Sequence, residues 1–367
     1  MSDQGEEVLL TGLPSFAARK TCEALLAGSP SRRVHAIVRD RDRDAFGAFL
    51  DELPLGARAR VVAMAGDAAA IDLGLSGAEW RRLVGTVDRI HHVAGGSRLG
   101  LSREEAMSEH VASAKEVLEL ARHTKGLKRL VHHSSACVAG ARTGIVREDE
   151  LAHGQSFRTV VEEAQAHAES LVRREQRVPW SIVRPTLVVG DSETGEVDRH
   201  EGPYFLMLLI VTSPPDVAIP LVGKGSFPLH VVPADYVAKF AVRVGGDARA
   251  VHRTFHVKDP SPPTARRVFE LVAEASGKRG PRGHIPANLT KALLRAPGLD
   301  RVAQSPRAFL DALLTPVEYD TSATDELLAS SPLECPPFHT YVDKLVDFVA
   351  QRQRERRERR AEGSEPP

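Results

Sequence analysis

The chain has 367 residues, of which 42% are apolar and only 5% aromatic, so its core has to be built mainly from aliphatic side chains. Lys and Arg together number 49, as do Asp and Glu, and this balance gives no overall attraction to nucleic acid or to an anionic membrane. Three well-separated cysteines without metal-ligand spacing suit a reducing compartment better than a disulfide framework.

The sequence predicts neither export nor insertion into a membrane. The acidic first residues run directly into a strand-like segment, which is not the pattern of a secretory signal. The longest apolar run, 205–211, is far shorter than the roughly 20 residues that span a bilayer. We therefore expect a cytoplasmic protein without a transmembrane segment.

Strand-like and helical patterns alternate along the first half of the chain. Apolar, strand-like runs occur at 8–10, 34–38, 61–64, 89–93, 129–133 and 180–184, and helical patterns at 16–26, 78–84, 104–124 and 160–174. Such alternation is typical of βαβ units and a parallel sheet. We predict an α/β fold with a doubly wound, mostly parallel, Rossmann-like sheet whose ligand crevice lies at the carboxyl ends of the strands.

Three ordered motifs give the chain a family resemblance. They are Gly66-Asp67 to Leu73-Gly74-Leu75-Ser76 leading into 87–94, then 183–195 (VRPTLVVGDSETG), and then 221–237 with its Val232-Pro233-Ala-Asp235-Tyr236-Val237 end. The chain resembles the extended short-chain dehydrogenase/reductase superfamily over roughly residues 7–275. Within it, the chain is most similar to the fatty acyl-CoA reductase and carrier-protein thioester reductase branch. The resemblance implies an NAD(P) cofactor and an acyl or carrier-bound ligand.

With this resemblance, the chain divides into three predicted regions. Residues 1–260 would form the NAD(P)-binding domain, with an insertion at 193–230 that contributes to the substrate mouth. Residues 261–350 would form a smaller helical cap, and residues 351–367 a charged tail. The apolar segment 204–211 is either a wall for an acyl chain or a buried helix. The tail, with six arginines and two glutamates in 352–360, is either a solvated helix or a contact for an acidic partner. The oligomeric state stays open.

The loop after the first strand departs from the family pattern T-G-x-x-G-x-x-G. It reads Thr11-Gly12-Leu-Pro14-Ser15-Phe16-Ala-Ala18. Gly12 can make the tight turn, but Ser15 replaces the glycine that lets the backbone approach the pyrophosphate. Pro14 removes one amide donor. We expect Thr11, Gly12, Ser15 and Phe16 to contact the cofactor, with weakened binding. A chain that binds no dinucleotide is the further alternative.

Other cofactor contacts follow from the resemblance. Arg39 ends the second strand, where an acid usually selects NAD, and a guanidinium suits the 2′-phosphate of NADP. An ordinary solvated arginine is the alternative. Asp67 would meet the adenine, unless it only closes an Asx turn. The remaining predicted contacts are Ala94, Gly95, Pro185 and Thr186.

The proton-transfer residues of the superfamily are missing. Its members use a Tyr-x-x-x-Lys pair on one helix face, with a serine that binds the carbonyl oxygen. Glu169, in Ala-Glu-x-Leu, and Phe157 fix the alignment, which puts Val161 at the tyrosine position and Gln165 at the lysine position. Ser135 takes the place of the catalytic serine, although a serine there is also a common turn residue.

No other group is an evident replacement. Cys137 has no base assigned to it, so a buried, inert thiol is favoured. Histidines 91, 92, 132 and 133 end adjacent strands without a carboxylate or cysteine in ligand spacing, so no metal is expected. His110, on the helix that follows the fourth strand, is favoured as a packed or solvated side chain over a base in the pocket.

Two functional hypotheses follow. The first is an NADP-binding pseudo-reductase of the acyl thioester type, with lost or much reduced hydride transfer. The alternative is an active NADPH-dependent oxidoreductase acting on an acyl thioester, aldehyde or related carbonyl, because orientation and oxyanion stabilisation alone can give substantial rate.

Overall fold

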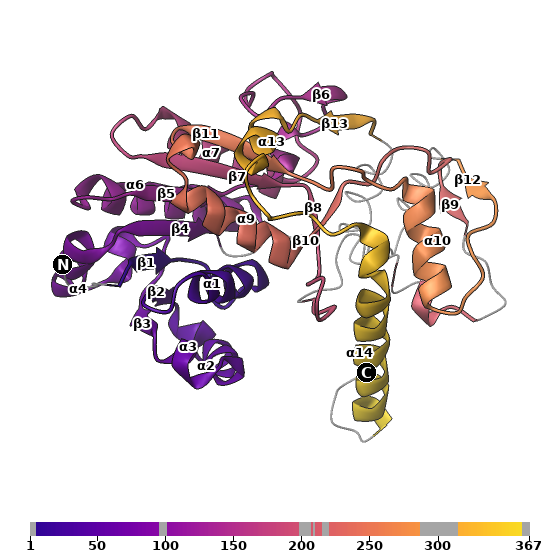
Figure 1. Ribbon diagram of the computed structural model, residues 1–367, viewed down its shortest axis with the longest axis horizontal. Helices are drawn as coiled ribbons and strands as arrows, with labels where there is room; N and C mark the ends of the chain where they lie inside the picture. Colours follow the sequence, from indigo (N-terminus) through magenta and orange to yellow (C-terminus); the bar gives the residue numbers. More distant parts are fainter. Residues whose placement is uncertain are drawn as a thin grey trace. The chain divides into compact units, whose positions relative to one another are not determined.

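The computed structural model describes residues 5–94, 101–197, 207, 210–214, 220–286 and 315–361. The chain divides into two compact units (Figure 1). The first comprises Met1–Thr186, Val237–Val257 and Glu318–Glu334, and the second comprises Leu187–Tyr236, Lys258–Val317 and Cys335–Pro367.

The first unit is built on a seven-stranded sheet in which every neighbouring pair is parallel. The strand order is β11-β7-β5-β4-β1-β2-β3. The chain order reverses between β1 and β4, which is the switch point where a doubly wound sheet binds its ligand. The predicted doubly wound sheet is therefore confirmed. Its strands are β1 (Glu7–Leu10), β2 (Arg33–Val38), β3 (Val61–Ala65), β4 (Arg89–Val93), β5 (Arg129–His133), β7 (Trp180–Pro185) and β11 (Arg253–Val257).

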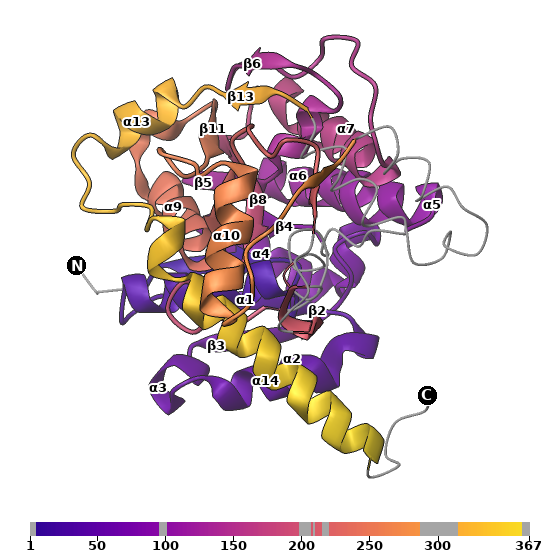
Figure 2. The ribbon, with the colours of Figure 1, turned by 90° about the vertical axis from the view of Figure 1, so that its right-hand side faces the viewer.

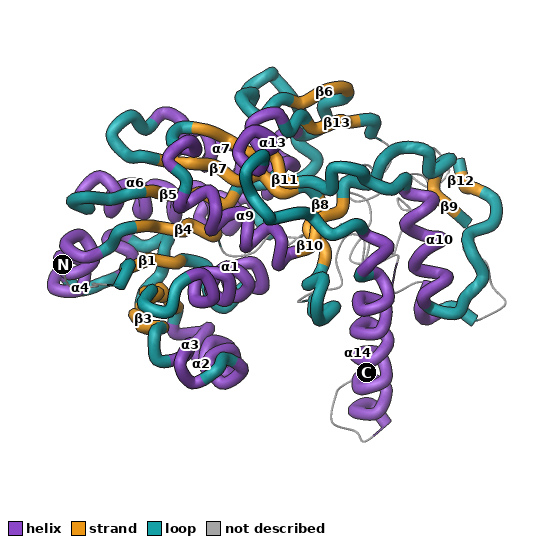
Figure 3. Tube along the Cα trace, viewed as in Figure 1, coloured by secondary structure: helices purple, strands orange, loops and turns teal. Residues whose placement is uncertain are grey.

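Helices cover both faces of this sheet, as the purple and orange segments of Figure 3 show. The helical segments of the unit are α1 (Phe16–Gly28), α2 (Arg43–Glu52), α3 (Leu55–Arg58), α4 (Gly77–Thr86), α5 (Arg103–Ala106), the π-helical turn η3 (Met107–Ala112), α6 (Ser113–His123), α7 (Val160–Arg174) and α13 (Ser322–Leu328), with α9 (Ala234–Gly246) joining from Val237 onward. The single helix predicted over 104–124 is thus interrupted by η3. Such π-helical turns are frequent at functional sites.

Alternate residues along the strands point to opposite faces of the sheet and contribute to two apolar layers, as expected for a parallel sheet covered on both faces. On one face, Leu9, Ile90 and Leu130 pack with residues of α4, α6 and α7. On the other, Val8, Leu10 and Val34 pack with residues of α1 and α2. The sheet is therefore held rigidly, and its carboxyl edge is fixed with it.

A late segment of the chain completes the first unit. Strand β13 (Val317–Tyr319) pairs with β6 (Gly144–Val146), and α13 follows it. The buried carboxylate of Glu148 accepts hydrogen bonds from Ala323 N, from Thr324 Oγ1 and from His256 N. This carboxylate joins the segment to β11.

The second unit has its own apolar core. Helices α10 (Ala265–Ala275) and α14 (Val342–Ala361) pack side by side, through residues such as Val268, Leu345 and Val349 (Figure 2). Short strands complete the unit, namely β8 (Leu187–Val189) with β10 (Val231–Pro233), and β9 (Leu221–Val222) with β12 (His284–Ile285). Across the described residues, none of the helices is both long and apolar enough to cross a bilayer.

Candidate dinucleotide and carbonyl site

A tight turn joins β1 to α1 at the position where the family pattern places its phosphate-binding loop. Gly12 lies at φ +86°, and a Cβ there would collide with the carbonyl oxygen of Val93. Only glycine fits this position without strain. The turn brings the start of α1 to the switch point between β1 and β4.

The start of α1 retains unsatisfied polar groups that suit an anion. Ser15 is the N-cap residue of α1, but its side chain caps no backbone N–H. Its buried Oγ has no hydrogen-bond partner within the described parts of the chain. The first amides of a helix also point outward, toward any anion bound there. These groups fit a dinucleotide pyrophosphate, although Ser15 narrows the seat that a glycine would leave open.

Arg39 lies directly after β2, as predicted, but it is already engaged. Its Nε donates a 2.7 Å hydrogen bond to Asp42, and its NH1 lies 3.8 Å from a carboxylate oxygen of Glu109. The side chain is 24% exposed, so an incoming phosphate can reach it. Two carboxylates beside one guanidinium would oppose a 2′-phosphate until at least one of them moves.

Asp67 closes an Asx turn, which was the alternative interpretation of this residue. Its Oδ1 accepts a 3.0 Å hydrogen bond from Ala69 N. The turn is held by unusual backbone nearby, because Asp72 and Leu73 have φ of 53° and 58°, and the Asp67 amide donates to the Leu73 carbonyl. The second carboxylate oxygen keeps acceptor capacity for an adenine amino group.

Thr11 joins β1 to β4 at the carboxyl edge of the sheet. It is fully buried, and its hydroxyl lies 2.8 Å from His92 Nδ1 and 3.0 Å from the Val93 carbonyl. Its side chain is thus used to hold the two strand ends together. Ala94 follows β4 directly, whereas Gly95 lies outside the described residues.

Pro185 is the last residue of β7, and Thr186 follows it at the same edge. Thr186 is 6% exposed and donates to the Val257 carbonyl through both its amide and its hydroxyl. These bonds fix β7 to β11 and leave the Thr186 side chain little freedom to bind a ligand.

Ser135 follows β5 and is half-buried. Its Oγ accepts a 3.1 Å hydrogen bond from Cys137 N, at the start of the short turn Ala136–Ala139. The serine therefore does close a turn, as one interpretation of the sequence had it. Because Oγ serves there as an acceptor, its proton remains available to a carbonyl oxygen.

Helix α7 carries an apolar and an amide side chain where the proton relay would be. Val161 is 5% exposed and belongs to a small apolar cluster with Ala106 and Ala164. Gln165, one turn later, is half-buried. Neither side chain can supply a proton to an alkoxide in the way that a tyrosine and lysine pair would.

Cys137 and Tyr319 lie near this helix but are poor substitutes. Burial raises the pKa of the Cys137 thiol, and the nearby Glu162 carboxylate raises it further, so the reactive thiolate is disfavoured. Burial likewise raises the pKa of the Tyr319 phenol, with Cys137 contributing. Tyr319 is therefore a weaker proton donor than a solvated phenol. Tyr204 lies outside the described residues.

The histidines at the ends of β4 and β5 form two buried groups. His91 and His133 are 3.2 Å apart on one face of the sheet, while the rings of His92 and His132 stack on the other. Burial lowers the pKa of His91 to about 3 and that of His132 to about 4. Within the described ranges, no cluster of three or more ligand-type side chains could hold a metal ion.

His110 adds to the second of these groups from η3. It is 4% exposed, and its Nε2 has no hydrogen-bond partner among the residues that the structure describes. Burial lowers the pKa of His110 to about 4, with His132 contributing. Of the packed and solvated alternatives, the structure shows the packed one, and this histidine is neutral near pH 7.

Comparison with known proteins gives the same family. The NAD-binding family described as "Male sterility protein" matches residues 10–241. A linear gramicidin synthase polypeptide of Brevibacillus parabrevis is 25% identical over 311 residues, which cover 79% of this chain and 6% of that protein. Fatty acyl-CoA reductase 1 of Xenopus laevis is 29% identical over 147 residues, covering 36% of this chain and 28% of that protein. The chain thus spans only a small part of these curated relatives.

A solved structure shares the fold over nearly the whole chain. The terminal R domain from the myxalamid PKS-NRPS biosynthetic pathway superposes with a TM-score of 0.78 at 21% identity, covering 96% of this chain and 92% of that one. Since the family match extends over more than half of the sequence, the chain belongs to the male sterility family of NAD-binding domains, within the extended short-chain dehydrogenase/reductase superfamily.

Proposed function

We propose that this protein binds NADPH and an acyl thioester, and that its hydride transfer is lost or much slower than in relatives with a Tyr-x-x-x-Lys pair. The observation that carries this proposal is the face of α7, where Val161 is packed in an apolar cluster and Gln165 follows it. The thioester class is supported by the likeness to a fatty acyl-CoA reductase. A carrier-bound thioester has the same reacting group.

The missing step is proton delivery. Bound NADPH would supply a hydride to the carbonyl carbon of the ligand. The carbonyl oxygen would then become an alkoxide, which needs a proton. Ser135 can donate a hydrogen bond to that oxygen, because its Oγ already accepts from Cys137 N. No phenol stands beside it on α7. Loss of a positioned general acid typically costs about 10²- to 10⁴-fold in rate.

NADP is proposed over NAD because of Arg39. Its guanidinium is exposed enough to bind a 2′-phosphate, which would replace Asp42 as its hydrogen-bond acceptor.

The free cysteines agree with a reducing, cytoplasmic setting.

The test is a fluorescence titration with NADPH, followed by single-turnover absorbance at 340 nm with decanoyl-CoA in the same buffer. We expect saturable NADPH binding and very slow or undetectable oxidation. A Val161→Tyr/Gln165→Lys double variant should gain rate, and a Val161→Phe/Gln165→Lys variant, which has the aromatic ring without the hydroxyl, controls for crowding at position 161. Absence of NADPH binding by the folded wild-type protein would contradict the proposal.

The second candidate is an active reductase, favoured by the oriented hydroxyl of Ser135. In that case the wild-type protein consumes NADPH steadily, and Ser135→Ala abolishes the consumption while NADPH binding persists. Cys137→Ser is the matched control, because it keeps the backbone amide that binds Ser135.

A further inference from the structure

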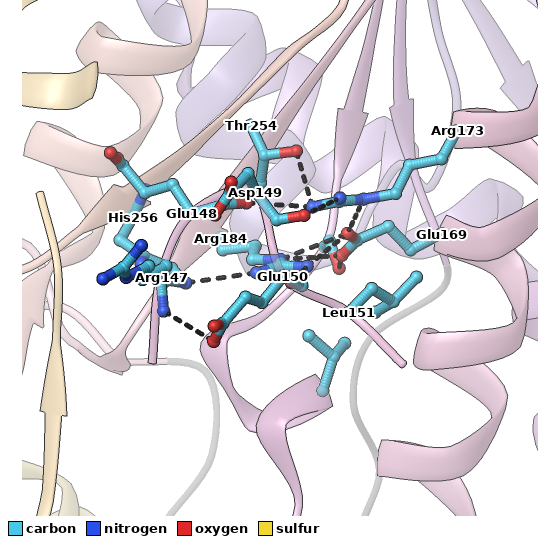
Figure 4. Close-up of polar contacts among 12 residues, drawn as sticks. Arg147, Glu148, Asp149, Glu150, Leu151, Glu169, Arg173, Arg184, Thr254 and His256 are labelled. Atoms are coloured by element: carbon cyan, nitrogen blue, oxygen red, sulfur yellow. Dashed lines mark hydrogen bonds and ion pairs between the residues drawn. The ribbon is translucent and has the colours of Figure 1, made fainter. Parts of the chain in front are cut away.

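A buried carboxylate close to the end of β5 accepts hydrogen bonds from three side chains. Glu169, on α7, is fully buried and sits among Arg184 and Arg173, as Figure 4 shows. Arg184 donates to both of its oxygens, at 2.6–3.2 Å, and Arg173 Nε donates to Oε1 at 2.7 Å. Burial is the largest single effect and raises the pKa of Glu169, but the charges of Arg184 and Arg173 and the hydrogen bonds from Arg184 and Ser134 together outweigh it and lower the pKa to about 2. The carboxylate is therefore ionised and fixed.

One oxygen of this carboxylate also binds a serine. Ser134 Oγ donates a 2.7 Å hydrogen bond to Glu169 Oε2. Ser134 is 8% exposed, and its amide donates to the Val183 carbonyl at 2.8 Å. Both sides of Ser134 are thus fastened, one to the neighbouring strand and one to α7.

This serine immediately precedes Ser135. Fixing Ser134 sets the direction in which the chain leaves β5, and the next residue begins the turn in which Cys137 N binds Ser135 Oγ. Glu169 also lies one turn beyond Gln165 and two beyond Val161, on the face of α7 that lacks the proton relay. That face therefore still contacts the end of β5, through a charged group.

We propose that Glu169 is a positioning residue that orients Ser135 toward the carbonyl of the ligand, acting through the hydroxyl of Ser134. The inference rests on the proposed function, in which Ser135 meets a thioester carbonyl. Arg184 and Arg173 already neutralise Glu169, so the bond to Ser134 is not needed to balance its charge. A charge-assisted hydrogen bond in a buried site holds its donor more firmly than a neutral one.

The test removes the Ser134 hydroxyl and leaves the ion pairs in place. We compare Ser134→Ala, the conservative Ser134→Thr, and Ser181→Ala, which removes another buried serine hydroxyl bonded to Arg129 and Ala250 far from the carboxyl edge. The first readout is amide hydrogen exchange at Cys137, which needs no turnover. The second is the single-turnover rate with NADPH and decanoyl-CoA, measured with each substitution placed in the Val161→Tyr/Gln165→Lys background, together with the Kd for NADPH.

Exchange at Cys137 should become about tenfold faster in Ser134→Ala, remain close to wild type in Ser134→Thr, and be unchanged in Ser181→Ala. The single-turnover rate should fall about tenfold in Ser134→Ala alone, with the Kd for NADPH unchanged. Unchanged exchange at Cys137 overturns the inference. The inference is also overturned if exchange at Cys137 becomes faster in Ser134→Ala while its single-turnover rate equals that of Ser181→Ala, because Ser134 would then have only a structural role.

Failure of the proposed function looks different. It would appear as absent NADPH binding, or as NADPH oxidation that decanoyl-CoA does not stimulate in any variant, including the Val161→Tyr/Gln165→Lys double variant. In that case the exchange rate at Cys137 alone decides whether Ser134 and Glu169 fix Ser135.

Discussion

Asp42 accepts a 2.7 Å hydrogen bond from Arg39 Nε at the end of β2, so the side chain placed to select NADP is held by a neighbouring acid. Replacing Asp42 by alanine should free Nε of this guanidinium, while Glu109 remains near NH1, and should tighten NADPH binding by about tenfold, because a hydrogen bond to a charged group contributes about 1.5–3 kcal/mol. Affinity for NADH, which lacks the 2′-phosphate, should change little. Arg39→Ala should remove the difference between the two cofactors. Parallel fluorescence titrations with NADPH and NADH give the ratio of the two Kd values for each variant. If this ratio equals that of the wild type in both variants, other residues determine the selectivity.

Gly12 offers a test of the phosphate loop. Gly12→Ala should abolish dinucleotide binding and lower the free energy of unfolding by about 1–3 kcal/mol, because its φ is positive and its Cβ would strike the Val93 carbonyl. Gly47, inside α2, is the matched control, since a Cβ there meets no atom within 4 Å. Gly47→Ala should stabilise the protein by about 0.5–1 kcal/mol. Urea unfolding measures the stability of both variants, and NADPH titration measures their binding. If Gly12→Ala and Gly47→Ala had the same effects, the turn geometry assigned to Gly12 would be wrong.

The buried histidines predict loss of stability in mild acid. The pKa of His91 is lowered to about 3, and those of His110 and His132 to about 4, mainly by burial. In the unfolded chain a histidine takes up a proton near pH 6.5. Between about pH 6.5 and pH 4 the unfolded state therefore binds more protons. Each of these histidines then lowers the free energy of unfolding by up to about 1.4 kcal/mol per pH unit as the pH falls.

Urea unfolding at several values between pH 7.5 and pH 5 measures this slope. His110→Asn should make the slope shallower, because it removes one of the groups that titrate differently in the two states. His167→Ala, which replaces an exposed histidine on α7, should leave the slope as in wild type. A slope insensitive to His110→Asn would show that this histidine is not buried in solution.

The cysteines should be unreactive in the folded protein. Burial raises the pKa of Cys22 and Cys335 to about 12, and it also raises the pKa of Cys137. Iodoacetamide at pH 8 should therefore modify them much more slowly than in urea, because only the thiolate reacts. Mass spectrometry of timed samples measures the rates. Fast modification of Cys137 in the native protein would contradict its interpretation as a buried, inert thiol.

Much of the fold could be predicted because its signals are local. Apolar runs alternate with helical patterns, and this alternation alone implies parallel strands with crossovers. Val161 and Gln165 could be placed because Glu169 lies a fixed number of residues beyond them on one helix. Gly12 could be assigned because a tight turn after a strand requires it.

The contacts of the site depend on residues that are distant in the sequence. Glu109 approaches Arg39 only because η3 packs near the end of β2, and no local pattern indicates this. The link from Glu169 to Ser134 and Arg184 joins two strands to a helix. A signal did exist, because the Glu169 and Arg184 positions both lie in family motifs. The motifs show which residues align with the family, but they do not indicate that Glu169 and Arg184 form an ion pair with each other.

The carboxylate of Glu148 bears on where the polypeptide can be shortened. It is 4% exposed, and two of its three donors come from Ala323 and Thr324. A fragment that stops before Glu318 would leave this buried carboxyl group without either of those donors. Expression trials of the nucleotide-binding half should therefore retain residues 318–334, even when everything else downstream of β11 is removed.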